Sequence, residues 1–238
     1  MQRNPRLFNP IWPIVYPVIR RSGGEIASEY DENLTAFAQI YTKNLWGNPE
    51  SRSGWGSTLA YTTTLRRHLT KLLVGLDVKT LLDAPCGDFN WMSHVPFPKG
   101  MHYIGADIVP DLIAALTAKY GNKPNHDFRV IDVAHEPLPS ADLWLCRDLL
   151  AHLRHADGLG VIRNFVASDI PYLLMKTYDF VAVNSDARPG GFRYVNLRRP
   201  PFRLGRPRIR IWDFMVPNPP GYLGLWSHDD IKAVLATQ

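Results

Sequence analysis

Residues 80–88 read TLLDAPCGD, a short apolar run that ends in an acid and then breaks into a turn containing Pro85 and Gly87. Similar runs recur downstream, each followed by polar turn residues: HYIGAD (102–107), DFRVIDV (127–133), DLWLCR (142–147) and PYLLMKT (171–177). Stretches with helical spacing separate most of these runs. Continuous apolar runs that alternate with helices are typical of βαβ units, in which parallel strands are buried on both faces. The sequence therefore predicts a doubly wound α/β fold, with a mostly parallel sheet of about seven strands and helices on both faces.

The two ends of the chain depart from this alternation. Residues 1–25 are rich in proline, arginine and aromatic residues and predict an extended arm, and apolar spacing predicts a helix over 33–45. At the other end, the last two strands are expected within 208–214 and 221–226, followed by a short helix that Ser227 caps.

The loop between the first helix and the main domain reads WGNPESRSGWGS (46–57) and is rich in glycine and serine. Ser57 or Thr58 is expected to cap the next helix, which runs through Leu73. We therefore divide the chain into residues 1–57, an arm, a helix and a lid loop, and residues 58–238, the main domain.

Composition excludes several classes of protein. The chain has 238 residues, of which 45% are hydrophobic and 21% charged, values that exclude disordered and collagen-like chains. Only Cys86 and Cys146 carry thiols, so a disulfide framework and a four-cysteine zinc site are excluded, and no metal is expected. The apolar N-terminal stretch 7–21 is broken by prolines, is short for a membrane span and lacks a signal-peptide cleavage site. We expect a protein of the cytoplasm without a membrane span.

Positive charge is concentrated in one window. Residues 188–210 contain eight arginines, no lysine and no acid, whereas the formal charge of the whole chain is only +5. Guanidinium groups suit bidentate recognition of phosphate or carboxylate, so this pattern favours an anionic partner. A solvated surface loop explains the same pattern equally well.

Acids fall where three predicted strands end. Asp83, Asp107 and Asp132 are 24 and 25 residues apart, about one βα unit each. In an open α/β sheet ligands bind at the carboxyl ends of the strands, and a carboxylate there can accept two hydrogen bonds from a ribose diol. The alternative is that these acids only cap the helices that follow.

These motifs together resemble the class I S-adenosylmethionine-dependent methyltransferases, which have a Rossmann-like fold. The resemblance covers residues 79–177: LLDAPCGD resembles their glycine-rich motif, YIGAD their ribose-binding strand, FRVIDV their adenine-side acid and DLWLCRDLLAHL their fourth strand with its following helix. Ahead of LLDAPCGD, the chain has Ile-Tyr, then Trp-Gly and then Ser-Gly-x-Gly-Ser. This order of motifs is similar to that of a bacterial subgroup of small methyltransferases within the class, whose members act on small molecules or glycans.

The resemblance implies a cofactor, S-adenosyl-L-methionine, and a role for each matching residue. Asp107 binds the ribose hydroxyls with Ile108 beside it, and Asp132 faces the adenine amino group with Val133 against the ring. Pro85, Cys86 and Gly87 form the turn that cradles the methionine portion, and Cys146 and Arg147 line the methyl-donor channel.

The turn departs from the family pattern in a way that bears on the ligand. The usual Gly-x-Gly-x-Gly becomes Pro85-Cys86-Gly87-Asp88-Phe89, which keeps only the middle glycine. A nicotinamide dinucleotide needs close backbone approach to its pyrophosphate, so the lost glycines count against it. The acids Asp83 and Asp88 suit a cationic sulfonium and would repel a diphosphate.

The lid loop supplies two further cofactor-binding candidates, Trp46 and Ser57. The resemblance implies that this loop closes over the cofactor and excludes water. An ordinary loop before a helix is the alternative.

Asp148 and His152 are the candidates for a catalytic base, with Asp148 slightly ahead. They are four residues apart and would share one face of a helix that follows the fourth strand. Histidine has a suitable intrinsic pKa, although a packed structural histidine is also common here.

Three functions remain open on the sequence. The first is methyl transfer at oxygen to a small-molecule or glycan acceptor, with the arginine window holding an anionic group of the acceptor. The second is RNA methylation, in which Phe192, Tyr194, Phe202 and Trp212 stack on bases between the arginines of 188–210. The third is a catalytically inactive methyltransferase fold that serves as a binding protein. The oligomeric state is left open.

Overall fold

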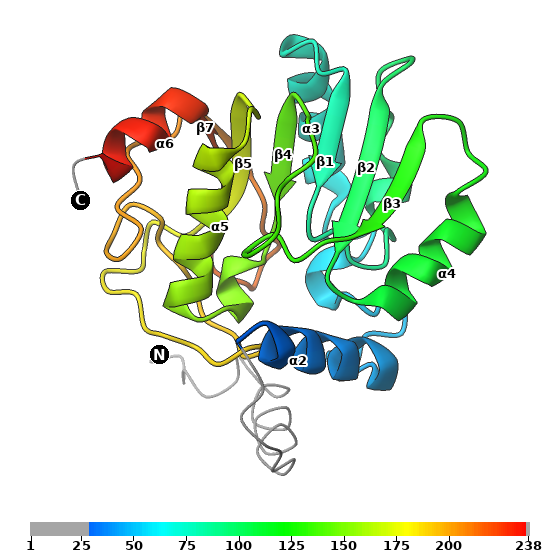
Figure 1. Ribbon diagram of the computed structural model, residues 1–238, viewed down its shortest axis with the longest axis horizontal. Coiled ribbons are helices and arrows are strands. Elements are labelled where there is room, and N and C mark those ends of the chain that lie inside the picture. The colour runs from blue at the N-terminus through cyan, green and yellow to red at the C-terminus, as the bar shows by residue number, and fades with distance from the viewer. Residues whose placement is uncertain (1–28, 237–238) are drawn as a thin grey trace, which may run out of the picture.

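The computed structural model describes residues 29–236, and it contains one seven-stranded sheet with the strand order β3-β2-β1-β4-β5-β7-β6 (Figure 1). The strands are β1 (Thr80–Asp83), β2 (His102–Asp107), β3 (His126–Val130), β4 (Leu143–Cys146), β5 (Tyr172–Thr177), β6 (Ile209–Trp212) and β7 (Tyr222–Ser227). All pairings are parallel except those of β7, which runs antiparallel to both β5 and β6. The predicted mostly parallel α/β sheet is confirmed, whereas the arm predicted over 1–25 lies outside the described residues.

The helices are α2 (Glu29–Lys43), α3 (Thr63–Gly75), α4 (Pro110–Tyr120), α5 (His155–Ala167) and α6 (His228–Leu235). Helices α3 and α4 bury leucine side chains in one apolar cluster, and α5 and α6 bury Val161, Ile162, Phe165 and Ile231 in a second cluster on the opposite face of the sheet. Neighbouring residues of the central strands divide between the clusters: Leu81 and Leu145 join the first, Leu82 and Trp144 the second. This division explains why the strands read as continuous apolar runs.

The order reversal of the sheet places the site. Strands β2 and β4 both pair with β1, so the chain leaves β1 toward one side of the sheet and returns on the other. Ligands of doubly wound folds bind at such a switch point, beyond the carboxyl ends of the strands. Helix α2 lies across this end of the sheet, below the strands in Figure 1.

Two predicted elements differ in detail, and a third agrees. The helix expected from Ser57 or Thr58 begins at Thr63, because Trp55–Ser57 first forms a 3-10 turn and the Thr58 hydroxyl donates to the Trp55 carbonyl. Strand β3 ends at Val130, so Asp132 lies in the following turn and not at the strand end. The terminal helix agrees with the prediction, since Ser227 forms a capping box with Asp230.

Candidate functional site

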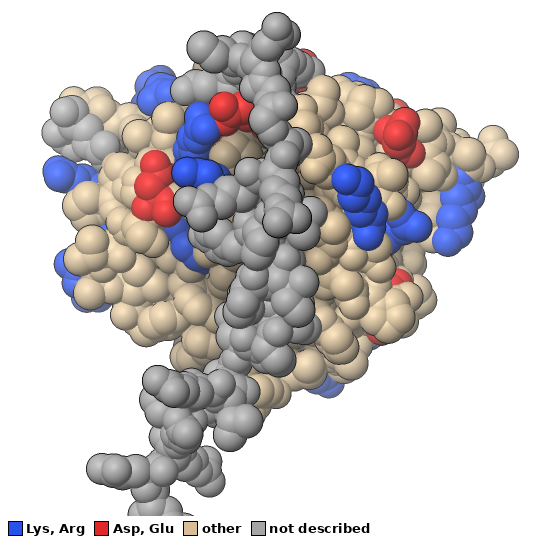
Figure 2. All heavy atoms as spheres, turned by 90° about the horizontal axis from the view of Figure 1, so that it is seen from below, with Lys and Arg blue, Asp and Glu red and all other residues tan. Residues whose placement is uncertain are grey.

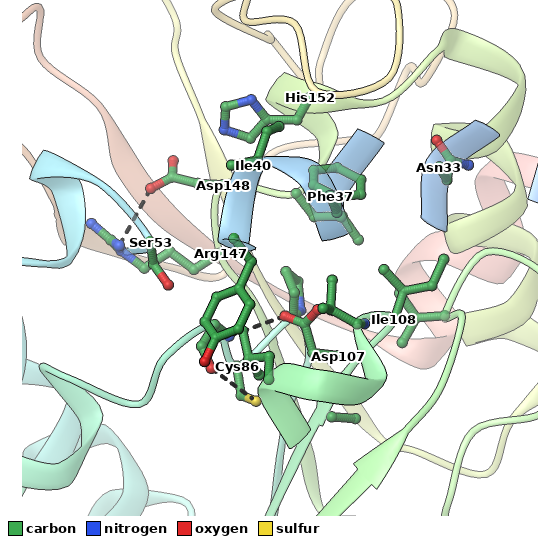
Figure 3. Close-up of a pocket in the computed structure, with 18 of the residues that line it drawn as sticks. Asn33, Phe37, Ile40, Ser53, Cys86, Asp107, Ile108, Arg147, Asp148 and His152 are labelled. Carbon is green, nitrogen blue, oxygen red and sulfur yellow. Dashed lines mark hydrogen bonds and ion pairs between the residues drawn. The ribbon is translucent and has the colours of Figure 1, made fainter. Parts of the chain in front are cut away.

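A cavity of about 1090 Å³, open solvent at its mouth included, lies over the carboxyl ends of β1, β2 and β4 (Figure 3). Helix α2 and the lid loop, residues 46–57, form its other walls. Figure 3 shows Asp148 and His152 together at one side of the cavity, and Asp107 with Ile108 at another.

The cavity brings together most of the residues singled out in the sequence. It is lined by Trp46, Ser57, Asp83, Pro85, Cys86, Gly87, Asp107, Ile108, Asp132, Val133, Arg147, Asp148 and His152. Two candidates are not part of this lining. Cys146 is fully buried in the apolar cluster under α5, and Asp88 instead binds the lid loop.

Asp107 is the last residue of β2 and is 8% exposed. Its carboxylate accepts hydrogen bonds from the backbone N–H of Gly87 at 3.2 Å and of Val109, at the start of α4, also at 3.2 Å. Burial raises the pKa of Asp107 to about 6 in spite of these bonds. Asp107 therefore connects the turn after β1 with the start of α4, and it also lines the cavity. Its contacts with the start of the helix do not prevent it from binding a ligand.

Asp132 lies beyond β3 and is 5% exposed. One of its oxygens accepts from the Ala134 N–H at 2.9 Å, and the other lies 2.8 Å from Nδ1 of His135. Each carboxylate oxygen has a second lone pair, so the side chain retains accepting capacity toward the cavity that it lines.

Asp83 ends β1 and is buried at 3% exposure. The Tyr103 hydroxyl donates to it at 2.7 Å, but burial dominates and raises the pKa of Asp83 to about 7. Its charge therefore changes close to neutral pH, within a cavity that it shares with Asp107.

The lid loop is bound directly to the glycine turn. Gly87 has φ +54°, and a Cβ built on it would lie 2.2 Å from Oγ of Ser53. The Ser53 hydroxyl accepts from the Asp88 N–H at 2.9 Å, while the Asp88 carboxylate accepts from the Ser51 hydroxyl and from the Arg52 N–H at 2.7 Å. The surviving glycine thus admits the lid, and Asp88 anchors it.

Arg147 follows β4 and connects the lid to a buried charge cluster. Its guanidinium donates to Asp213 at 2.8 Å and to the Gly56 carbonyl at 2.8 Å, and it lies 3.3 Å from the Asp148 carboxylate. Lys176 also binds Asp213, at 2.6 Å. Although burial raises it, the pKa of Asp213 is held at about 2 by these two cations. The positive charges of Arg147 and Lys176 are therefore balanced by the carboxylates of Asp213 and Asp148, and these contacts fix Arg147 in place.

Asp148 and His152 both line the cavity, but not as neighbours on a helix. Asp148 has φ +59°, and Leu150–His152 forms only a 3-10 turn before α5 begins. The expected shared helix face is wrong for this reason. A non-glycine residue at such a φ is strained, a feature that concentrates at functional sites.

The position of the His152 ring defines its chemistry. Nδ1 lies 2.6 Å from the Gly191 carbonyl, which can only accept, so Nδ1 carries the proton and Nε2 of the neutral ring has a free lone pair. Burial lowers the pKa of His152. The Trp46 ring lies 5.0 Å from the imidazole, and the buried Trp46 indole N–H has no hydrogen-bond partner.

Several lining residues were not identified as site residues from the sequence. Asn33, Phe37, Ile40 and Tyr41 of α2 contribute to the cavity wall, as does Trp91. Apolar spacing predicted the helix, but the same spacing is expected whether a helix covers a core or a cavity. Asp213 and Lys176 carried no local signal at all.

None of the eight arginines of 188–210 lines the cavity. Acids from outside the window pair with several of them: Asp179 with Arg198 at 3.7 Å and Arg210 at 3.0 Å, and Asp230 with Arg208 at 2.6 Å. Figure 2, seen from below relative to Figure 1, shows basic and acidic side chains next to one another on this face of the molecule. Nearby acids therefore compensate part of the positive charge of residues 188–210. The prediction that these arginines form part of the pocket is not met, because none of them lines it.

Between residues 29 and 236, no group of three or more histidine, cysteine, aspartate or glutamate side chains is arranged to hold a metal ion. In the same part of the chain no helix has the length and apolar character needed to cross a bilayer.

Comparison with known proteins was made at the levels of sequence and structure. No protein-family model matches the sequence, and no curated protein matches it significantly. Solved structures do match. The 1,6-didemethyltoxoflavin N1-methyltransferase of Burkholderia thailandensis, solved with its acceptor and S-adenosylhomocysteine, has a TM-score of 0.59 at 13% identity over 87% of this chain and 92% of that chain.

A second match is the magnesium protoporphyrin IX methyltransferase of Synechocystis PCC 6803, solved with bound S-adenosylmethionine. It has a TM-score of 0.56 at 10% identity and covers 86% of this chain and 99% of that chain. Identities this low show the fold alone. Together with the strand order and the cavity at the switch point, they show that this chain has the fold of the class I S-adenosylmethionine-dependent methyltransferases.

Proposed function

We propose that the protein transfers a methyl group from S-adenosylmethionine to a small-molecule acceptor, at oxygen. The observation that carries this proposal is the cavity at the switch point, where Asp107 ends β2 directly beside the Gly87 turn. A carboxylate in this position suits a ribose diol, and the turn 85–87 lines the same cavity.

The residues present fit this donor. Asp107 would accept from the ribose hydroxyls, Asp132 and Val133 would face the adenine, and the turn 85–87 would hold the methionine portion. The unpaired indole N–H of Trp46 offers a further donor in the cavity wall. When bound, the donor supplies an electrophilic methyl group on a positively charged sulfur, which the carboxylates of Asp83 and Asp107 attract.

The acceptor would be activated at the side of the cavity formed by His152 and Asp148. The free Nε2 of His152 can remove a proton from a hydroxyl, and its lowered pKa keeps the ring neutral and therefore competent near pH 7. Asp148 is held by Arg147 and can accept a hydrogen bond from the acceptor, which orients it. With the base thus placed, the protein contributes mainly alignment and exclusion of water under the lid.

A His152→Asn variant tests the assignment of the base. Asparagine can still donate to the Gly191 carbonyl from the position of Nδ1, but it lacks Nε2. We expect kcat to fall by about 10²- to 10⁴-fold, with affinity for S-adenosylhomocysteine unchanged. The wild-type rate should rise with pH through a value below the usual histidine pKa and then level off, and the variant should lose this step. Asp148→Asn is measured beside it. If only Asp148→Asn lowers kcat, Asp148 and not His152 is the base.

The pH dependence of donor binding tests the role of the two buried acids. Burial raises the pKa of Asp83 to about 7 and that of Asp107 to about 6, so both become ionised as pH rises from 5.5 to 8. The affinity for the cationic S-adenosylmethionine, relative to the uncharged sulfur of S-adenosylhomocysteine, should therefore rise over this range by about tenfold. Calorimetric titrations at both pH values check this, and Asp83→Asn should flatten the rise. A ratio that stays constant with pH would remove both acids from sulfonium recognition.

The proposed reaction is tested by incubating the protein with S-adenosylmethionine and a panel of hydroxylated small molecules, sugars and short RNA, with formation of S-adenosylhomocysteine as the readout. Turnover with a small molecule supports the proposal. Turnover with RNA alone, weakened by salt as phosphate contacts require, would replace it with the RNA alternative. Donor binding without turnover on any acceptor would favour a binding protein.

A further inference from the structure

Asn33 of α2 has an amide oxygen that no described residue pairs. The side chain is 2% exposed and belongs to the lining of the cavity. Its Oδ1 atom is nevertheless buried without a hydrogen-bond partner among residues 29–236. Buried polar atoms in native proteins are nearly always paired, so an unpaired acceptor in a cavity wall indicates a ligand group that donates to it.

The neighbouring helix fixes the orientation of this amide. Nδ2 of Asn33 donates to the carboxylate of Asp157, in the first turn of α5, at 3.1 Å. A carboxylate accepts hydrogen bonds, so the amide nitrogen must face Asp157 and the amide oxygen must face elsewhere. Asp157 is itself 3% exposed, and an ion pair between Glu32 and Arg154 joins the same two helices. Asn33 therefore offers an acceptor whose position is set before any ligand binds.

The contacts of Asp157 place Asn33 beside Asp132. Oδ1 of Asp157 is 3.9 Å from Nε2 of His135, and Nδ1 of the same ring is 2.8 Å from the Asp132 carboxylate. One carboxylate and one imidazole thus bridge Asn33 and Asp132, which both line the cavity. Figure 3 shows Asn33 on the side of the cavity away from His152. The unpaired oxygen therefore belongs to the wall proposed to face the adenine and not to the reactive side.

The chemistry of this wall matches a primary amino group on a ring. Asn33 contributes an amide oxygen and Asp132 a carboxylate, and both groups accept hydrogen bonds without donating them. The 6-amino group of adenine carries two N–H donors that point in different directions, so each acceptor can take one. A 6-oxo group would instead place a third acceptor against these two, which a site built to accept hydrogen bonds rejects.

We propose that Asn33 is a second recognition residue for the adenine of the methyl donor, whose 6-amino group donates one hydrogen to Oδ1 of Asn33 and the other to Asp132. This inference rests on the proposed function and names a residue that determines selectivity for the donor. Because Asn33 belongs to α2, the helix that covers the cavity takes part in donor binding directly.

The test compares S-adenosyl-L-homocysteine with its N6-methyl derivative, each titrated by calorimetry into the full chain. With two acceptors both hydrogens of the amino group are used, so a methyl group must displace one hydrogen bond. We expect the wild type to bind the N6-methyl derivative at least about tenfold more weakly. With Asp132 as the single acceptor, the methyl group would point away from it and the two ligands would bind alike.

An Asn33→Ala variant removes the second acceptor and leaves space for the methyl group. We expect it to bind S-adenosylhomocysteine about 5- to 30-fold more weakly than the wild type does, and to bind the two ligands within about threefold of each other.

Asn44→Gly is the matched control. Nδ2 of Asn44 donates to the Asn48 carbonyl at 3.2 Å and its buried Oδ1 is also unpaired, but Asn44 does not line the cavity. Glycine suits the φ of +49° at this position, so the control should bind both ligands as the wild type does.

Two results would overturn the inference while the proposed function stands: equal binding of the two ligands by the wild type, or an unchanged affinity of Asn33→Ala for S-adenosylhomocysteine. If Asn33→Ala did not fold, the comparison of the two ligands on the wild type would decide alone. If the wild type did not bind S-adenosylhomocysteine at all, the proposed function would fail and this inference with it.

Discussion

An Asp107→Ala variant will lose about 100-fold or more of its affinity for S-adenosylmethionine and S-adenosylhomocysteine. A buried carboxylate that accepts two hydroxyl donors contributes about 1.5–3 kcal/mol for each bond, and alanine removes this acceptor from both ribose hydroxyls. Calorimetric titration measures the loss. Both ligands should lose affinity because each has the ribose, and S-adenosylmethionine should lose more because its sulfonium also loses the attraction of the carboxylate.

The controls for this variant separate binding from folding. Asp107 also accepts from the Gly87 and Val109 backbones, so thermal unfolding must show that the variant is still folded. Asp111→Ala alters an exposed acid in the first turn of α4 and should bind like the wild type. If a folded Asp107→Ala protein kept wild-type affinity, the ribose would have to be bound elsewhere.

A Gly87→Ala variant will lose donor binding and turnover by about 10- to 100-fold, for a different reason. The new Cβ would lie 2.2 Å from Oγ and 3.0 Å from Cβ of Ser53, so the Ser53 side chain has to shift away from the turn. This shift breaks the hydrogen bond from the Asp88 N–H to Ser53 and weakens the contact by which the lid loop excludes water from the cavity.

The chain offers a matched control for backbone strain in this experiment. Gly100 has φ +79° and open space around the position of a Cβ, so Gly100→Ala adds a similar strain of about 1 kcal/mol without displacing the lid. Both variants should lower the thermal unfolding temperature alike, but only Gly87→Ala should lose function. Adding Ser53→Gly to Gly87→Ala should restore part of the binding. Equal losses in the two alanine variants would show that strain, and not the lid, is responsible.

The sheet and the acids at its carboxyl edge were predictable from the sequence because their signals are local. A buried parallel strand is a continuous apolar run, and Asp83 and Asp107 end two such runs directly. Asp132 was placed at a strand end although β3 stops two residues earlier, since the apolar residues Ile131 and Val133 extend the run into the turn.

The remaining parts of the site depend on contacts between distant residues. Asp213 binds Arg147 from 66 residues away, and no spacing in the sequence indicates that pair. The partial compensation of the arginine window could not be predicted for the same reason, because the acids Asp179 and Asp230, which pair with three of its arginines, lie outside it. The helix expected through Asp148 and His152 failed because Asp148 adopts a left-handed conformation, which neighbouring residues do not reveal.

Whether the cavity binds the methyl donor is tested by calorimetric titration of the wild-type protein with S-adenosylhomocysteine, with S-adenosylmethionine as competitor and NAD⁺ as a negative control. We expect S-adenosylhomocysteine to bind at one site with a dissociation constant of about 1 μM, corresponding to about −8 kcal/mol, and to be displaced by S-adenosylmethionine but not by NAD⁺. Absence of binding by S-adenosylhomocysteine, or equal competition by NAD⁺, would contradict the assignment of this cavity as a methyl-donor site.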